Sequence, residues 1–182
     1  IQFSLKMRLG WENASECMVL VELLNTLRLS RIALHARTGK QQYKGHPDLE
    51  AFQGFYELCQ HPLYYNGGIE SLSDIRQILI RFPLLKGVFI GRGLLSSPLL
   101  AKEFKGNETF LPEQRMSIYF AFHEELFSAY SQVLQGETQL LVKMKTLWEY
   151  FLPETDRKLL KRIKKSTRLQ QYTESVKAIF TS

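Results

Sequence analysis

Cysteine is scarce in this sequence, because only Cys17 and Cys59 occur among its 182 residues. The two lie far apart, and neither belongs to a CxxC motif or to a histidine-rich segment. We therefore expect neither a disulfide framework nor a zinc site. A low cysteine content is typical of proteins in the reducing cytoplasm, where we expect this one to act.

Long apolar runs are also absent. No apolar segment reaches the roughly 18–20 residues that cross a membrane. The chain opens in a strand-like pattern, without an initiator methionine or a basic-then-apolar leader. We therefore expect neither a membrane nor a metal ion among the partners of this protein.

Acidic residues are fewer than basic ones. The chain has 24 lysines and arginines against 18 aspartates and glutamates, for a net charge of +6. An apolar content of 45% is ordinary for a globular protein. The positive balance favours a polyanionic partner.

Strand-like and helix-like segments alternate over residues 1–105. The hydrophobic pattern predicts strands at residues 3–9, 31–37, 63–66 and 87–90. It predicts helices at residues 17–27, 48–59 and 71–82, and a short helix that begins at Ser97-Pro98. Asn13 with Glu16, and Ser71 with Asp74, have the spacing of a capping box at a helix start. Helices between consecutive strands predict a parallel sheet with right-handed crossovers.

The period becomes purely helical over residues 106–182. Breaks at Gly106-Asn107, Gly136, Pro153 and Ser166-Thr167 separate four amphipathic segments. The fold class is therefore α/β, as the C-terminal half of a TIM-type (βα)8 barrel followed by a small all-α helical bundle. Four βα units make only half of such a barrel, so we expect an N-terminal portion to complete it.

Polar residues gather at the C-terminal ends of the four predicted strands, where a βα barrel keeps its active site. Lys6 and Arg8 share one face of the first strand, and His35 and Arg37 share one face of the second. The other two strands end in the turns Asn66-Gly67-Gly68 and Gly91-Arg92-Gly93. Glycine turns of this kind can bring backbone N–H groups to a phosphate. Solvated strand ends and plain turns are the alternative interpretation.

These residues resemble the tRNA-dihydrouridine synthases. The resemblance rests on four motifs in the family order: Lys6-Met7-Arg8-Leu9-Gly10-Trp11, His35-Ala36-Arg37-Thr38 with Tyr43-Lys44-Gly45, Tyr65-Asn66-Gly67-Gly68-Ile69 and Ile90-Gly91-Arg92-Gly93. The resemblance implies an FMN-containing βα barrel with a C-terminal helical domain, which uses NADPH to reduce uridines in tRNA. It also implies that the full-length protein is a monomer.

The resemblance assigns roles to residues of this chain. It places Lys6 and His35 beside FMN, and Arg8 and Arg37 toward the target uracil. The phosphate of FMN would be held by Asn66, Gly67, Gly68, Gly91 and Arg92. The family often has an acidic residue where Gly68 stands. Its proton-donor cysteine lies in the earlier half of the barrel, so no catalytic residue is expected in this chain, which should be inactive alone.

A basic segment follows Pro153. Its cations are Arg157, Lys158, Lys161, Arg162, Lys164 and Lys165, with Arg168 nearby. A helix with these cations on its surface can lie along an RNA backbone, and a solvated helix face is the alternative. Two other functions stay open: another FMN-dependent barrel oxidoreductase that acts on a small molecule, similar to dihydroorotate dehydrogenase, or a non-catalytic RNA-binding remnant.

Overall fold

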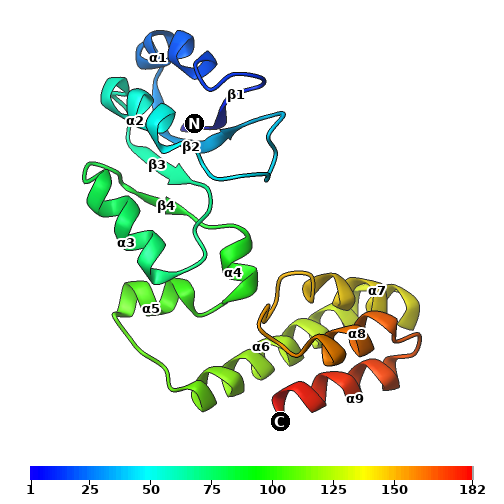
Figure 1. Ribbon diagram of the computed structural model, residues 1–182. Coiled ribbons are helices and arrows are strands. Elements are labelled where there is room, and N and C mark those ends of the chain that lie inside the picture. The colour runs from blue at the N-terminus through cyan, green and yellow to red at the C-terminus, as the bar shows by residue number, and fades with distance from the viewer. Residues whose placement is uncertain (182) are drawn as a thin grey trace. The chain divides into compact units, whose positions relative to one another are not determined.

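The computed structural model describes residues 1–181. The chain forms two compact units, Ile1–Gly93 and Leu94–Ser182. Figure 1 shows the sheet with its helices in the first part of the chain and helices alone in the last part.

The first unit is built on a four-stranded parallel sheet. Its strands are β1 (Phe3–Gly10), β2 (Leu29–Thr38), β3 (Leu63–Asn66) and β4 (Gly87–Phe89), in the spatial order β1-β2-β3-β4. Helices α1 (Glu16–Thr26), α2 (Leu49–Leu58) and α3 (Leu72–Arg81) connect them (Figure 1). The four predicted strands and the three helices between them are confirmed.

The core of the first unit lies on one face of the sheet. Ile32 and Leu34 of β2 and Leu63 of β3 are buried there, and α1 and α2 pack on this side. Phe52 of α2 meets the ring of Tyr65 edge-on, with the ring centroids 4.9 Å apart. Because side chains alternate along a strand, the neighbours of these residues point to the other face, which carries the polar side chains.

One of the two predicted capping boxes differs from the prediction. The capping box of Ser71 and Asp74 is confirmed at the start of α3. Only half of the box of Asn13 and Glu16 is present: the Glu16 carboxylate bonds back to the N–H of Asn13, but the N-cap of α1 is Ser15, without a side-chain cap. The Glu16 carboxylate accepts hydrogen bonds from the backbone N–H groups of Trp11, Glu12 and Asn13, and these bonds, that of Asn13 foremost, lower the pKa of Glu16.

The segment after β4 also differs from the prediction. A short helix, α4 (Arg92–Ser96), starts within the last glycine turn and was not predicted. The helix expected from Ser97-Pro98 begins later, as α5 (Leu100–Gly106). The Ser97 carbonyl accepts a hydrogen bond from the N–H of Leu100, so Ser97 and Pro98 form the turn that leads into α5.

The second unit contains α5 and four longer helices. These are α6 (Pro112–Val133), α7 (Glu137–Leu147), α8 (Arg157–Lys165) and α9 (Leu169–Phe180), separated at the predicted breaks. Their shared core includes Met144, Phe151, Ile163 and Tyr172, each with 0% exposure. No helix among the described residues is long and apolar enough to span a membrane.

Candidate functional site

The strand register brings the predicted cationic residues together. Arg8 of β1 lies opposite His35 of β2, and His35 lies opposite Asn66 of β3. Residues paired in this way point to the same face, so the three side chains form one row at the C-terminal ends of the strands. Lys6 precedes Arg8 on that face and Arg37 follows His35. We call Lys6, Arg8, His35, Arg37 and Arg92 the strand-end cluster.

His35 and Arg37 form the buried centre of this cluster. The Nη1 of Arg37 donates to the Nε2 of His35 over 3.4 Å, and its Nη2 donates to the Gly45 carbonyl over 2.9 Å. Because a guanidinium only donates, Nε2 is the unprotonated nitrogen of the imidazole. The Nε of Arg37 is buried and has no hydrogen-bond partner among the described residues. A buried donor without a partner is unusual and marks a place for an acceptor.

The charged side chains of the strand-end cluster are all positive. Burial, together with the charges of Arg8, Lys6, Arg37 and Arg92, lowers the pKa of His35 to about 4. Burial also lowers the pKa of Arg37, with a contribution from Arg92. Within residues 1–181, Lys6, Arg8 and Arg37 form no ion pair with a carboxylate. A neutral histidine among uncompensated cations is an environment that favours an anion.

Arg8 organises the loop between β2 and α2. Its Nη1 donates to the carbonyls of Thr38 and Gln42, at 2.7 and 2.9 Å. This places the ring of Tyr43 beside the cluster, with the guanidinium carbons of Arg92 and Arg8 at 4.4 and 5.7 Å from the ring centroid. The Tyr43 and His35 rings are 6.3 Å apart. Tyr43 was not predicted as a site residue, although an aromatic residue in a loop after two strand-end cations is a recognisable signal.

The turn after β3 has the properties of an anion-binding turn. Gly67 and Gly68 have φ angles of +132° and +60°. The N–H of Gly68 donates no hydrogen bond within residues 1–181. A Cβ on Gly68 would lie 2.9 Å from the Cγ of Pro47, so the acidic residue expected for the family would be strained here. The side chain of Asn66 donates to the Phe89 carbonyl over 2.8 Å and thereby ties this turn to β4.

The turn after β4 contains two glycines in different surroundings, one tightly packed and one beside open space. An added Cβ on Gly93 would collide with the Ile69 carbonyl, so Gly93 serves the close approach of two turns. An added Cβ on Gly91 would meet nothing within 4 Å. The space in front of Gly91 is therefore available to a ligand. The open space at Gly91 and the N–H of Gly68 together fit a phosphate group.

The two thiols do not belong to this cluster. Cys17 is buried in α1, where its Sγ donates to the Ala14 carbonyl over 3.2 Å, and Cys59 ends α2. Burial raises the pKa of both thiols, which keeps them protonated. No group of three or more His, Cys, Asp or Glu side chains suited to a metal ion occurs among the described residues.

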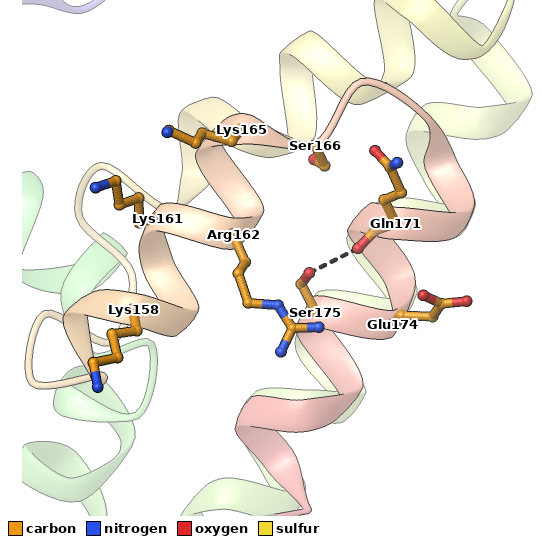
Figure 2. A pocket seen from close by; sticks show the side chains of 8 residues that line it. All are labelled: Lys158, Lys161, Arg162, Lys165, Ser166, Gln171, Glu174 and Ser175. Atoms are coloured by element: carbon orange, nitrogen blue, oxygen red, sulfur yellow. Dashed lines mark hydrogen bonds between the residues drawn. The ribbon is translucent and has the colours of Figure 1, made fainter.

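The predicted RNA-binding residues lie on α8 in the second unit. Ile163 packs this helix into the core, and the Asp156 carboxylate caps its first turn. Lys158, Lys161, Arg162 and Lys165 line a groove of about 450 Å³ together with Gln171, Glu174 and Ser175 of α9. Figure 2 shows Arg162 extending from α8 toward Ser175 on α9. Arg157 and Lys164 belong to the same helix but do not line the groove. Four cations against one carboxylate make it strongly positive.

The chain is similar to several known proteins. A model of the dihydrouridine synthase family matches residues 1–181. The probable tRNA-dihydrouridine synthase of Aquifex aeolicus is 35% identical over 105 residues, which cover 58% of this chain and 33% of that protein. The tRNA-dihydrouridine(16) synthase of Escherichia coli is 28% identical over 110 residues, which cover 60% of this chain and 35% of that protein.

The matched part of this chain spans about a third of the length of its first curated relatives. The family model, in contrast, covers nearly all of the chain, through both the strand-end cluster and the helices of the second unit. Parallel sheet, cationic strand ends and glycine turns therefore have a common explanation: the chain belongs to the dihydrouridine synthase family.

Proposed function

We propose that this chain is part of an enzyme that reduces uridine to dihydrouridine in tRNA, with FMN as cofactor and NADPH as reductant. In this proposal residues 1–105 are the C-terminal half of a βα barrel, and residues 106–182 are a helical tRNA-binding domain. The ends of the strands carry the proposal, because they combine the neutral His35, the cations Lys6, Arg8 and Arg37, which have no carboxylate partner within residues 1–181, and two glycine turns. A tRNA substrate implies a cytoplasmic protein, and we expect the full-length form to be monomeric.

The residues of the cluster divide into two sets in this proposal. Gly67, Gly68, Gly91 and Arg92 hold the phosphate of FMN, and Asn66 keeps the two turns together. Lys6 and His35 lie toward the flavin ring, where the positive charge of Lys6 favours the reduced, anionic form. When bound, FMN supplies the hydride that passes to the uracil.

Arg8 and Arg37 are assigned to the uracil side. Both donate hydrogen bonds, and uracil offers two carbonyl oxygens as acceptors. Because Arg8 also holds the β2–α2 loop, it fixes Tyr43 at the same place. A ring in this position can stack on a base.

The proton that completes the reduction needs an acid that this chain lacks in the right place. Cys17 is buried and Cys59 is half-buried, both lie in or at the end of helices outside the strand-end cluster, and burial raises the pKa of both thiols. We therefore assign the proton donor to a cysteine outside residues 1–182. It follows that this chain alone does not catalyse the reduction of uridine.

A chimera tests the activity directly. Residues 1–182 are joined to the N-terminal part of the Aquifex aeolicus relative, and the product is given FMN, NADPH and tRNA from a strain without dihydrouridine. We expect dihydrouridine by mass spectrometry, and much less of it when Lys6→Ala is introduced. A folded, flavin-loaded chimera that forms none would contradict the proposed function.

A further inference from the structure

A second cavity lies in the first unit, outside the strand-end cluster. It measures about 350 Å³ and is lined by residues before α2, by the end of β3 with its glycine turn, and by α3. Tyr65 lies in its wall. Because Tyr65 and Asn66 are adjacent on one strand, they point to opposite faces of the sheet. The cavity is therefore on the helix-covered side, and its volume is typical of a small-molecule site.

The hydroxyl of Tyr65 has no protein partner in the part of the chain that the structure describes. The residue is only 1% exposed, and its hydroxyl makes no hydrogen bond within residues 1–181. Burial raises the pKa of this phenol to about 12, so it is protonated and able to donate. Buried hydroxyls in native proteins almost always have a partner. The cavity beside Tyr65 is where such a partner fits.

Two acceptors of the lining are only partly used. The Oδ2 of half-buried Asp74 accepts from the N–H groups of Glu70 and Ser71, and its Oδ1 accepts no hydrogen bond among the described residues. The Nε2 of exposed Gln77 donates to the Ser73 hydroxyl, and its carbonyl oxygen likewise accepts none from residues 1–181. A ligand that donates hydrogen bonds would satisfy both groups, and a ligand that also accepts would satisfy Tyr65.

Charge and shape narrow the class of ligand. The lining holds one carboxylate, Asp74, and one guanidinium, Arg81, which is already paired with Glu50. The cavity thus has little net charge and gives no advantage to an ion. Pro47, Leu49, Ile69 and Ile78 supply apolar walls. The complementary molecule is neutral, partly apolar and rich in hydrogen-bonding groups along its edge.

We propose that this α2–α3 cavity is a second binding site, which takes a neutral nucleoside. The base lies against the apolar walls, and its edge or its ribose hydroxyls bond to Tyr65, Asp74 and Gln77. A free nucleoside and an unpaired nucleoside within RNA share this chemistry. The site goes beyond the proposed function, since it lies on the opposite face of the sheet from the strand-end cluster. The two sites are neighbours, since Gly67 lies against the ring of His35 and the charge of Arg37 acts to lower the pKa of Tyr65.

NMR titration of the whole chain tests the site. Uridine, adenosine and a five-nucleotide single-stranded RNA are added separately to labelled protein. We expect saturable shifts of the Ile69 and Ile78 methyl groups and of the Gly67 and Gly68 amides. Shifts with uridine or adenosine would mean that the site binds a free nucleoside. Shifts with the oligonucleotide alone would mean that it binds an unpaired nucleoside within RNA.

Two variants separate binding from folding. Tyr65→Phe removes only the unpartnered hydroxyl, so we expect affinity to fall about two- to tenfold while the melting temperature stays the same or rises. Tyr56→Phe is the matched control, because the Tyr56 hydroxyl accepts a hydrogen bond from the N–H of Leu84. It should lower the melting temperature and leave nucleoside affinity unchanged. Arg92→Ala should also leave this affinity unchanged, which keeps the result independent of the FMN site.

Three outcomes would overturn the inference. The first is the absence of shifts with all three ligands at millimolar concentration, which would mean that water alone fills the cavity. The second is equal affinity of wild-type protein and Tyr65→Phe. The third is a clear loss of stability in Tyr65→Phe, since that would show that the hydroxyl already has a structural partner. If Tyr65→Phe fails to fold, Gln77→Ala on the exposed side of α3 provides the same comparison of affinities.

Discussion

His35 shows how burial and charge can act in the same direction on one side chain. Its imidazole is buried among four cations, and each of them adds to the cost of a further positive charge. The ring consequently stays neutral and accepts a hydrogen bond from Arg37. A neutral ring can lie beside a flavin or a base without repelling the cations that hold an anion.

The first prediction concerns acid stability. The imidazole titrates near 6.5 in the unfolded chain and near 4 in the folded one. Between these values the unfolded state binds more protons, so the free energy of unfolding should fall as the pH drops from 6.5 toward 4. NMR titration of the His35 ring gives the midpoint, and urea unfolding at several pH values gives the stability.

Buried His123 also has a lowered pKa and therefore also contributes to the loss of stability in acid. The variant His35→Gln removes only the contribution of His35. The acid-induced loss should be smaller in this variant than in the wild type. Inorganic phosphate should raise the pKa of His35, because an anion offsets the nearby cations. A His35 midpoint near 6.5 without any ligand would contradict the electrostatic account of the cluster.

Gly68 and Gly91 form a matched pair for a second prediction. Gly68→Ala places a Cβ at a φ of +60° and 2.9 Å from Pro47, so it should cost about 1–2 kcal/mol of stability. Gly91→Ala adds a methyl group where no atom lies within 4 Å, and should change stability by less than about 0.5 kcal/mol. It should instead weaken FMN binding, which flavin fluorescence in the chimera measures. Equal effects of the two variants on both quantities would refute this division.

At the scale of elements, α8 separates packing from charge on a single helix. Ile163 is fully buried in the core of the second unit, while the lysines and arginines around it are exposed. The Nζ of Lys145 donates to the Ser166 carbonyl over 2.8 Å at the end of this helix. The fold of α8 therefore does not depend on its surface cations, which are available to a phosphate backbone.

The third prediction follows from this separation. The triple variant Lys161→Glu, Lys164→Glu and Lys165→Glu should weaken tRNA binding and flatten its salt dependence. Each lost phosphate contact lowers the slope of log affinity against log salt by roughly 0.7–0.9. Filter binding across a salt series measures this slope.

Reversal of three exposed lysines on other helices and loops, Lys86, Lys105 and Lys177, gives a control with the same change in net charge. That control should retain most of the salt slope. If both triple variants behave alike, net charge rather than the α8 surface determines RNA affinity. Circular dichroism should show that both keep the helix content of the wild type.

At the scale of the whole molecule, the sheet has two outer strands. β1 and β4 each have one neighbouring strand, and Ile1 and Phe3 at the start of β1 are 112% and 65% exposed. Unpaired edges and exposed apolar side chains promote pairing with other chains. The fourth prediction is that the 182-residue chain self-associates as its concentration rises, and that Phe3→Lys reduces this. Analytical ultracentrifugation measures both, and a monomer at all concentrations would contradict the prediction.

The strands and most helices could be predicted from the sequence because each is a short periodic run between clear breaks. The position of Tyr43 could not, since it depends on hydrogen bonds from Arg8 to the loop carbonyls. The helix α4 was missed because Gly91-Arg92-Gly93 has the composition of a turn. The capping residue of α1 was misplaced because Glu16 binds three backbone N–H groups at once. Contacts between residues that are distant in the sequence cannot be predicted from local sequence patterns.

Trp11 and Trp148, the two tryptophans of the chain, are divided between the two units and lie in opposite surroundings. Trp11 is 65% exposed at the end of β1, whereas Trp148 is 2% exposed and donates to the Tyr172 hydroxyl over 3.0 Å. Their fluorescence should therefore differ in wavelength, with a long-wavelength emission from Trp11 that iodide quenches and a short-wavelength emission from Trp148 that it does not reach. Each unit thus carries its own optical reporter, and the natural protein reports on the melting of either unit without an added label.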